Sequence, residues 1–254
     1  MKKIIILLYI FVCSTYIYPQ GFYAKLGAGY ALGTNTALIN IEFDTNTVHG
    51  DYGSFGEGFT PKLSLGYMFC NTIGFEVGGT YLIGKKFEHE HVSGGLTETH
   101  KMWGEGILIS PSIVITAPMK SVTPYVRFGG VLGLVKLKEE ETESGTGART
   151  GTNKIEHTGN IGLGISGALG VMFKAGKMLN IFAEIHGQGM NYAPGQRENT
   201  ETFSGETPDP VITYEEEFPT NTSNTSLTPR IPFSNYGINV GVNLNFGKSG
   251  KTKK

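Results

Sequence analysis

The chain has 254 residues, a net charge of −1 and only 17% charged residues, a balance that gives no electrostatic basis for a nucleic-acid partner. No stretch of 18 apolar residues occurs beyond the N-terminus, which excludes a protein that crosses a membrane with helices. Glycine accounts for 37 residues, and these lie inside runs of alternating apolar and small or polar residues. That distribution indicates β-strands with closely packed faces rather than disorder.

Residues 1–20 have the pattern of a secretory signal peptide. Two lysines near the start precede an apolar core, Ile4–Val12, that is too short to span a bilayer. Cys13 raises the alternative of a lipoprotein anchor, although the valine before it does not suit that cleavage motif. Cleavage after residue 20 would leave Cys70 as the sole cysteine, so we expect no internal disulfide in the mature protein.

Eight later stretches place apolar residues at every second position. In the first of them, Phe22, Ala24 and Leu26 share one face, whereas Lys25 and Gly27 share the other. This period of two predicts strands with one apolar and one polar face. In chain order the predicted strands are Gly21–Leu32, Phe59–Phe69, Ile73–Ile83, Met102–Thr116, Val122–Leu137, Asn160–Phe173, Leu179–Tyr192 and Phe233–Phe246.

The connections between these strands alternate in length. Long polar loops at 33–58, 85–101, 138–158 and 193–231 follow the odd-numbered strands, and tight turns follow the even-numbered ones. Barrels of the outer membrane have long outer loops and short periplasmic turns. The pattern therefore predicts an eight-stranded antiparallel up-and-down transmembrane β-barrel with both termini in the periplasm. Aromatic residues are expected to form a girdle at each end of it.

The last predicted strand carries a sharper motif. Asn239, Gly241, Leu244 and Phe246 have the spacing of a polar residue, a glycine, a hydrophobic residue and an aromatic one. This resembles the C-terminal signal that the barrel-assembly machinery reads in bacterial outer-membrane β-barrels. By topology, residues 21–247 resemble the small outer-membrane β-barrel proteins of the OmpA/OmpX type, followed by a basic periplasmic tail at 248–254. The resemblance implies location in the cell outer membrane, contact with its lipid, and outer loops that meet the environment.

A barrel of eight strands is just wide enough for its own side chains to fill. Three bases and three acids are predicted to point inward, which would balance because buried charges must be paired. We expect the pairs Lys62–Glu76 and Arg127–Glu184, with His186 joining them. This network serves either as a plug or as a gated polar path, and the sequence leaves both open. The predicted interior residues are Lys25, Lys62, Glu76, Glu105, Arg127, Glu184 and His186.

Three further patterns bear on possible chemistry. Ser234 is part of a dipeptide found in lipid A deacylases, but Pro232 stands where a histidine base is needed, so no enzyme is expected. Glu88–His91 could hold a metal ion, yet a pair of histidines in an exposed loop is more often solvated surface. The same holds for the acidic runs Glu139–Glu141 and Glu215–Glu217.

The predicted outer loops are acidic as a group. Residues 33–58 carry four acids and no base, and residues 193–231 carry seven acids and two bases. A negative rim disfavours binding of phosphates or heparin, although divalent cations could bridge it. We therefore expect a structural or surface-interaction barrel with no cofactor. A narrow channel for ions or small solutes is the first alternative, and a lipid A-modifying enzyme is the second.

Overall fold

The computed structural model describes residues 21–34, 37–43, 48–217 and 224–246. The predicted signal peptide and basic tail lie outside these ranges. Within them the regular elements are all β-strands, and no helix has the length and apolarity needed to cross a bilayer.

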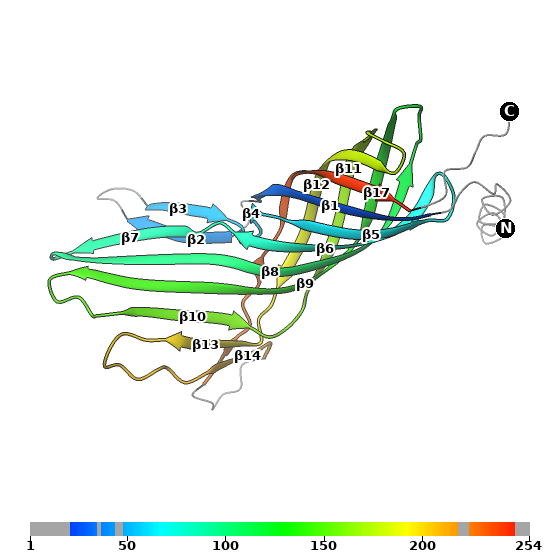
Figure 1. Cartoon of the computed structure of the whole chain (residues 1–254). Helices are drawn as coiled ribbons and strands as arrows, with labels where there is room; N and C mark the ends of the chain where they lie inside the picture. The colour runs from blue at the N-terminus through cyan, green and yellow to red at the C-terminus, as the bar shows by residue number, and fades with distance from the viewer. Residues whose placement is uncertain (1–20, 35–36, 44–47, 218–223, 247–254) are drawn as a thin grey trace, which may run out of the picture.

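The long strands pair in a circuit that returns to its starting point (Figure 1). β1 pairs with β5, and the pairing continues through β6, β8, β9, β11 and β12 to β17, which pairs with β1 again. Every pairing in this ring is antiparallel, so the last strand closes on the first and neither is left with an open edge. The ring strands are β1 (Gly21–Gly33), β5 (Lys62–Met68), β6 (Ile73–Gly84), β8 (Leu96–Thr116), β9 (Val122–Gly145), β11 (Gly162–Lys174), β12 (Leu179–Tyr192) and β17 (Asn235–Asn245).

The predicted strand Phe59–Phe69 is interrupted. The structure divides it into β4 (Gly58–Phe59) and β5, with Pro61 between them. Proline has no N–H group to donate to a neighbouring strand, which explains the break. Thr60 keeps the two pieces in line, because its backbone exchanges hydrogen bonds of 3.2 and 2.9 Å with the backbone of Gly29.

Much of the sequence that was predicted as outer loop forms strands instead. β8 begins before the expected Met102, and β9 continues well beyond Leu137. Together with shorter strands they form a sheet, here called the protruding sheet, that extends from one end of the ring to the left of Figure 1. Most side chains of the added strands are exposed or half-buried, so these strands need no apolar face, and the period of two that marks the ring strands is absent. The additional strands are β7 (Phe87–Ser93), β10 (Thr152–Thr158), β13 (Gln196–Glu201), β14 (Ile212–Glu215) and β15 (Thr225–Leu227); β16 (Ile231–Pro232) pairs with β12, and β2 (Ala37–Phe43) and β3 (Val48–Gly53) form a separate pair.

The outward face of the ring is apolar and exposed, and we call it the apolar belt. Aromatic rings lie outward at both ends of it, with Phe22 and Phe246 at the turn end and Tyr30 and Tyr81 at the other. Exposed apolar side chains on this scale need a partner other than water. Between the aromatic ends the belt contains Leu26, Leu63, Leu65, Val77, Ile107, Ile109, Ile113, Ile115, Val126, Phe128, Leu132, Leu134, Leu163, Ile165, Leu169, Ile181, Ile185, Ile238, Val240 and Leu244.

Ten buried apolar side chains form one cluster near the end of the ring from which the protruding sheet extends. Phe233 is fully buried there, and its ring meets those of Phe55 and Tyr192 at centroid distances of 6.4 and 5.9 Å. Phe87 and Met102 pack against the same cluster. This apolar plug comprises Phe55, Leu82, Leu108, Val131, Val135, Leu137, Met190, Tyr192, Ile231 and Phe233.

Candidate functional site

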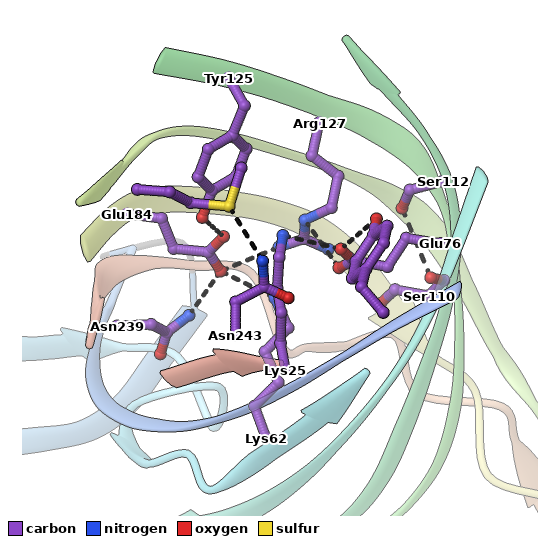
Figure 2. A network of polar contacts seen from close by, with 12 residues as sticks. Lys25, Lys62, Glu76, Ser110, Ser112, Tyr125, Arg127, Glu184, Asn239 and Asn243 are labelled. Carbon is purple, nitrogen blue, oxygen red and sulfur yellow. Dashed lines mark hydrogen bonds and ion pairs between the residues drawn. The ribbon is translucent and has the colours of Figure 1, made fainter. Parts of the chain in front are cut away.

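Five charged side chains meet inside the ring and form the charge network shown in Figure 2. Lys25 Nζ lies 2.8 Å from Glu76 Oε2, and Lys62 Nζ lies 2.7 Å from Glu184 Oε1. Arg127 bridges the two carboxylates, with Nη2 at 3.1 Å from Glu184 and Nε at 3.6 Å from Glu76. Each of the five is at most 5% exposed. Because they come from β1, β5, β6, β9 and β12, the network ties together strands from all around the ring.

Neutral side chains add hydrogen bonds to the two carboxylates, although Glu76 Oε1 accepts none among the described contacts. The hydroxyl of Tyr23 donates to Glu76 at 3.0 Å, and the hydroxyl of Tyr125 donates to Glu184 at 2.8 Å. The amide of Asn239 donates to Glu184 Oε1 at 3.1 Å. Sequence reasoning missed both tyrosines as members of the site. Alternation does predict both on the inward face, since Tyr23 is two residues from Lys25 and Tyr125 two residues from Arg127, but the predicted network did not include them.

The predicted pair Lys62–Glu76 is wrong, whereas Arg127 and Glu184 are in contact. In the strand register Lys62 lies opposite Thr80, while Glu76 lies opposite Gly66, four residues along β5. Four residues of strand span roughly 13 Å, farther than a lysine reaches sideways. Lys62 instead crosses the interior to Glu184 on the facing wall, as the narrow ring allows.

The prediction that Glu105 belongs to the interior network is also wrong. Glu105 has the same parity along β8 as the exposed Ile107, and it lies opposite Lys136 on the outer side of the sheet. Its carboxylate pairs with Lys138 at 2.7 Å and with Lys136 at 3.7 Å.

His186 lies next to the charge network without forming an ion pair in it. Its Nδ1 is 3.1 Å from the Asn239 amide nitrogen, which also donates to Glu184. The Asn239 carbonyl oxygen accepts from Thr60 at 3.4 Å, which fixes the orientation of the amide. His186 Nδ1 is therefore a hydrogen-bond acceptor, and the imidazole is neutral.

The residues of the proposed assembly signal divide between the two faces of β17. Asn239 points inward to Glu184, and Leu244 and Phe246 are exposed on the outside. A Cβ atom at Gly241 would lie 2.2 Å from the carbonyl oxygen of Leu26, so no side chain fits there. Recognition of this strand by the assembly machinery stays a prediction.

The other candidate residues have structural partners. Ser234 Oγ donates to the backbone oxygen of Met190 at 3.3 Å and accepts from its nitrogen at 3.1 Å. Glu88–His91 lies in β7, and the described residues contain no group of three or more His, Cys, Asp or Glu side chains placed to hold a metal ion. The expectation that the chain is not an enzyme stays untested.

The acidic run Glu139–Glu141 is not a solvated loop but part of β9 in the protruding sheet. Glu139 Oε1 lies 2.9 Å from His157 Nε2, and Tyr214 lies 3.0 Å from the other ring nitrogen. Glu141 and Glu143 both pair with Arg149 across the turn that follows β9. Side-chain pairing, as well as backbone pairing, therefore holds the sheet together.

Acid should loosen this part of the sheet. Burial raises the pKa of Glu139, but the hydrogen bond with His157 and nearby positive charge outweigh it, so the pKa lies below its ordinary value of 4.5. A lowered pKa means that the pairing stabilises fully above the ordinary value and is lost as the pH falls through the folded one. We expect the amide hydrogens between β9 and β10 to lose protection from exchange when the pH falls below about 4, after correction for the intrinsic exchange rate. In Glu139→Gln this pH-dependent loss should be absent. If the loss of protection is the same in Glu139→Gln, another carboxylate is responsible for it.

Solved structures with a similar fold are small outer-membrane β-barrel proteins. Neisserial surface protein A is 16% identical, with coverage of 90% of this chain and 100% of that one and a TM-score of 0.43. A major outer membrane protein from Thermus thermophilus is 10% identical, with coverage of 90% of this chain and 100% of that one and a TM-score of 0.47. Outer Membrane Protein W of E. coli is 11% identical, with coverage of 91% of this chain and 100% of that one and a TM-score of 0.38. No protein-family model and no curated protein sequence matches the chain. At these identities the likeness concerns the fold alone.

Proposed function

We propose that the chain is an eight-stranded transmembrane β-barrel of the bacterial outer membrane, with a structural or surface-interaction role carried by its protruding sheet. The apolar belt on a closed antiparallel ring supports this best. Lipid offers no hydrogen bonds, so a sheet surrounded by it must close, and its outward side chains must be apolar. The ring of pairings and the belt meet both conditions at once.

The membrane assignment has a direct test. The mature chain should require detergent for solubility and should migrate differently on gels before and after boiling. Free solubility without detergent, with one mobility under both conditions, would contradict it.

The role of the protruding sheet can be tested without disturbing the ring. Short Asn-Gly turns would replace residues 87–101 and 139–156, which removes two hairpins but no residue paired between β6 and β8. We expect the barrel to keep its heat-dependent mobility, while surface partners that the intact chain captures in a pull-down are lost. Repeating the assay with added calcium and with EDTA would test whether divalent cations bridge the acidic surface. Equal capture with and without the hairpins would contradict a surface role for them.

The channel alternative depends on an open interior, and two layers occupy it. The charge network fills one level, and the apolar plug fills the level nearer the protruding sheet. We expect planar bilayers with the purified barrel to show no steady conductance step; a reproducible step would favour the channel. Mass spectrometry of lipid A from a deletion strain tests the enzyme alternative, and we expect no change.

A further inference from the structure

The charge network contains one more cation than it has carboxylates. Among the described residues, the lysines, arginines and acids that are buried are Lys25, Lys62 and Arg127 against Glu76 and Glu184. Glu105, which was expected to be the third acid, pairs with lysines on the outside of the sheet. The neutral imidazole of His186 adds no charge to the network. A buried excess charge is costly unless a counter-charge accompanies it.

Among the described contacts, Lys25 differs from the other two cations because it pairs with a carboxylate without a hydrogen bond of good geometry, whereas Lys62 and Arg127 each donate one to Glu184. Lys62 and Arg127 both contact Glu184, and Arg127 also approaches Glu76. Lys25 has Glu76 Oε2 as its paired oxygen, and in the described part of the chain its ammonium makes no hydrogen bond of good geometry. Its Nζ lies 4.3 Å from the centre of the Tyr125 ring. An ammonium group has three N–H donors, so at least two remain available.

Lys25 borders a cavity at the turn end of the ring, which we call the vestibule. The vestibule has a volume of about 300 Å³, and Lys25, Asn243, Asn180 and Lys177 are among its lining residues. Asn243 lies directly opposite Lys25 on one side and Asn180 on the other, so the three form one inward-facing row across β1, β17 and β12. Figure 2 shows Asn243 beside Lys25. At about 30 Å³ per water molecule, the vestibule has room for a small ion with part of its hydration shell.

The surface around the vestibule is basic. The described residues of the three tight turns contain Lys120, Lys174 and Lys177 and no acid. The opposite end of the molecule carries the acidic segments. A cleft lined by one sign of charge concentrates ions of the other sign, so the turn end attracts anions.

We propose that the vestibule binds a small inorganic anion of the chloride type, which supplies the charge that the network lacks. The Lys25 ammonium holds it, the amide of Asn180 donates to it, and Lys177 draws it in. The amide nitrogen of Asn243 donates instead to Met172 Sδ and Asn245 Oδ1, at 3.4 and 3.3 Å. This site does not depend on the surface role proposed above.

Chloride alone serves as the probe, with the full mature chain refolded in chloride-free zwitterionic detergent. We expect ³⁵Cl resonance broadening that exceeds the detergent blank and is competed by bromide. Asn243→Asp places a carboxylate opposite Lys25 and should weaken chloride binding by roughly tenfold or more, because a fixed negative charge occupies the site. Chloride should also raise the midpoint temperature of the gel-mobility transition in the wild type but not in Asn243→Asp.

Asn224→Asp, the same chemical change on the exposed segment before β15, is the matched control and should bind as the wild type does. Lys25→Met should abolish broadening, and Asn243→Asp keeps the test decisive if that variant fails to fold. Wild-type broadening no greater than the blank, or full broadening in Asn243→Asp, would overturn the proposal.

Discussion

Glu184→Gln is expected to lower the free energy of unfolding by about 3–5 kcal/mol, the loss typical when one member of a buried ion pair is removed. Glu184 accepts from Lys62, Arg127, Tyr125 and Asn239. The substitution preserves shape, so the effect reports charge rather than a cavity. It also raises the positive excess of the interior. Urea titration of the barrel refolded in lipid vesicles, followed by Trp103 fluorescence, provides the measurement.

Glu156→Gln is the control for this substitution. Glu156 pairs with Lys136 at 3.0 Å and with Lys138 at 3.4 Å, but on the water-exposed outer side of the protruding sheet. Partly exposed pairs contribute at most about 1 kcal/mol. Equal losses for Glu184→Gln and Glu156→Gln would show that the charge network is no more important to stability than the surface.

Ile185→Arg should destabilise the protein by about 2–4 kcal/mol in lipid vesicles, because a charged side chain would face hydrocarbon near the middle of the belt. Val92→Arg is the matched control. The two residues are equally exposed, at 64% and 67%, but Val92 lies in β7 of the protruding sheet. In a protein surrounded by water, both changes would fall within about 0.5 kcal/mol of zero.

The two positions have similar exposed fractions. A difference in stability between the two variants therefore reports whether lipid or water surrounds each side chain. Folding yield in vesicles, read as the fraction with unboiled gel mobility, gives a second measure. A similar response of both variants would contradict a lipid-facing belt.

Alternation along the chain predicted the ring strands well because each needs one apolar and one polar face. The bounds of β12 agree with the prediction, and Lys25, Arg127 and Glu184 point inward as expected. Alternation should also have excluded Glu105, which has the parity of Ile107.

Two features could not be predicted from sequence. The partner of Lys62 depends on which walls of the ring face each other, and neighbours in a hairpin do not reveal this. The strands of the protruding sheet have polar residues on both faces, so they carry no periodic signal. Their pairing follows from β8 and β9, which already lie side by side in the ring and continue together beyond it.

The length of the β8–β9 ladder, which keeps one register on both sides of a gap at Ser110 and Pro111, has a mechanical consequence. The ladder runs from Thr116 and Tyr125 at the turn end to Leu96 and Gly145 at the tip of the sheet. A pull on that tip along the strand axes would load many hydrogen bonds in shear simultaneously instead of unzipping them one by one. In the membrane orientation proposed above, the sheet would transmit tension from the cell surface to the strands of the ring.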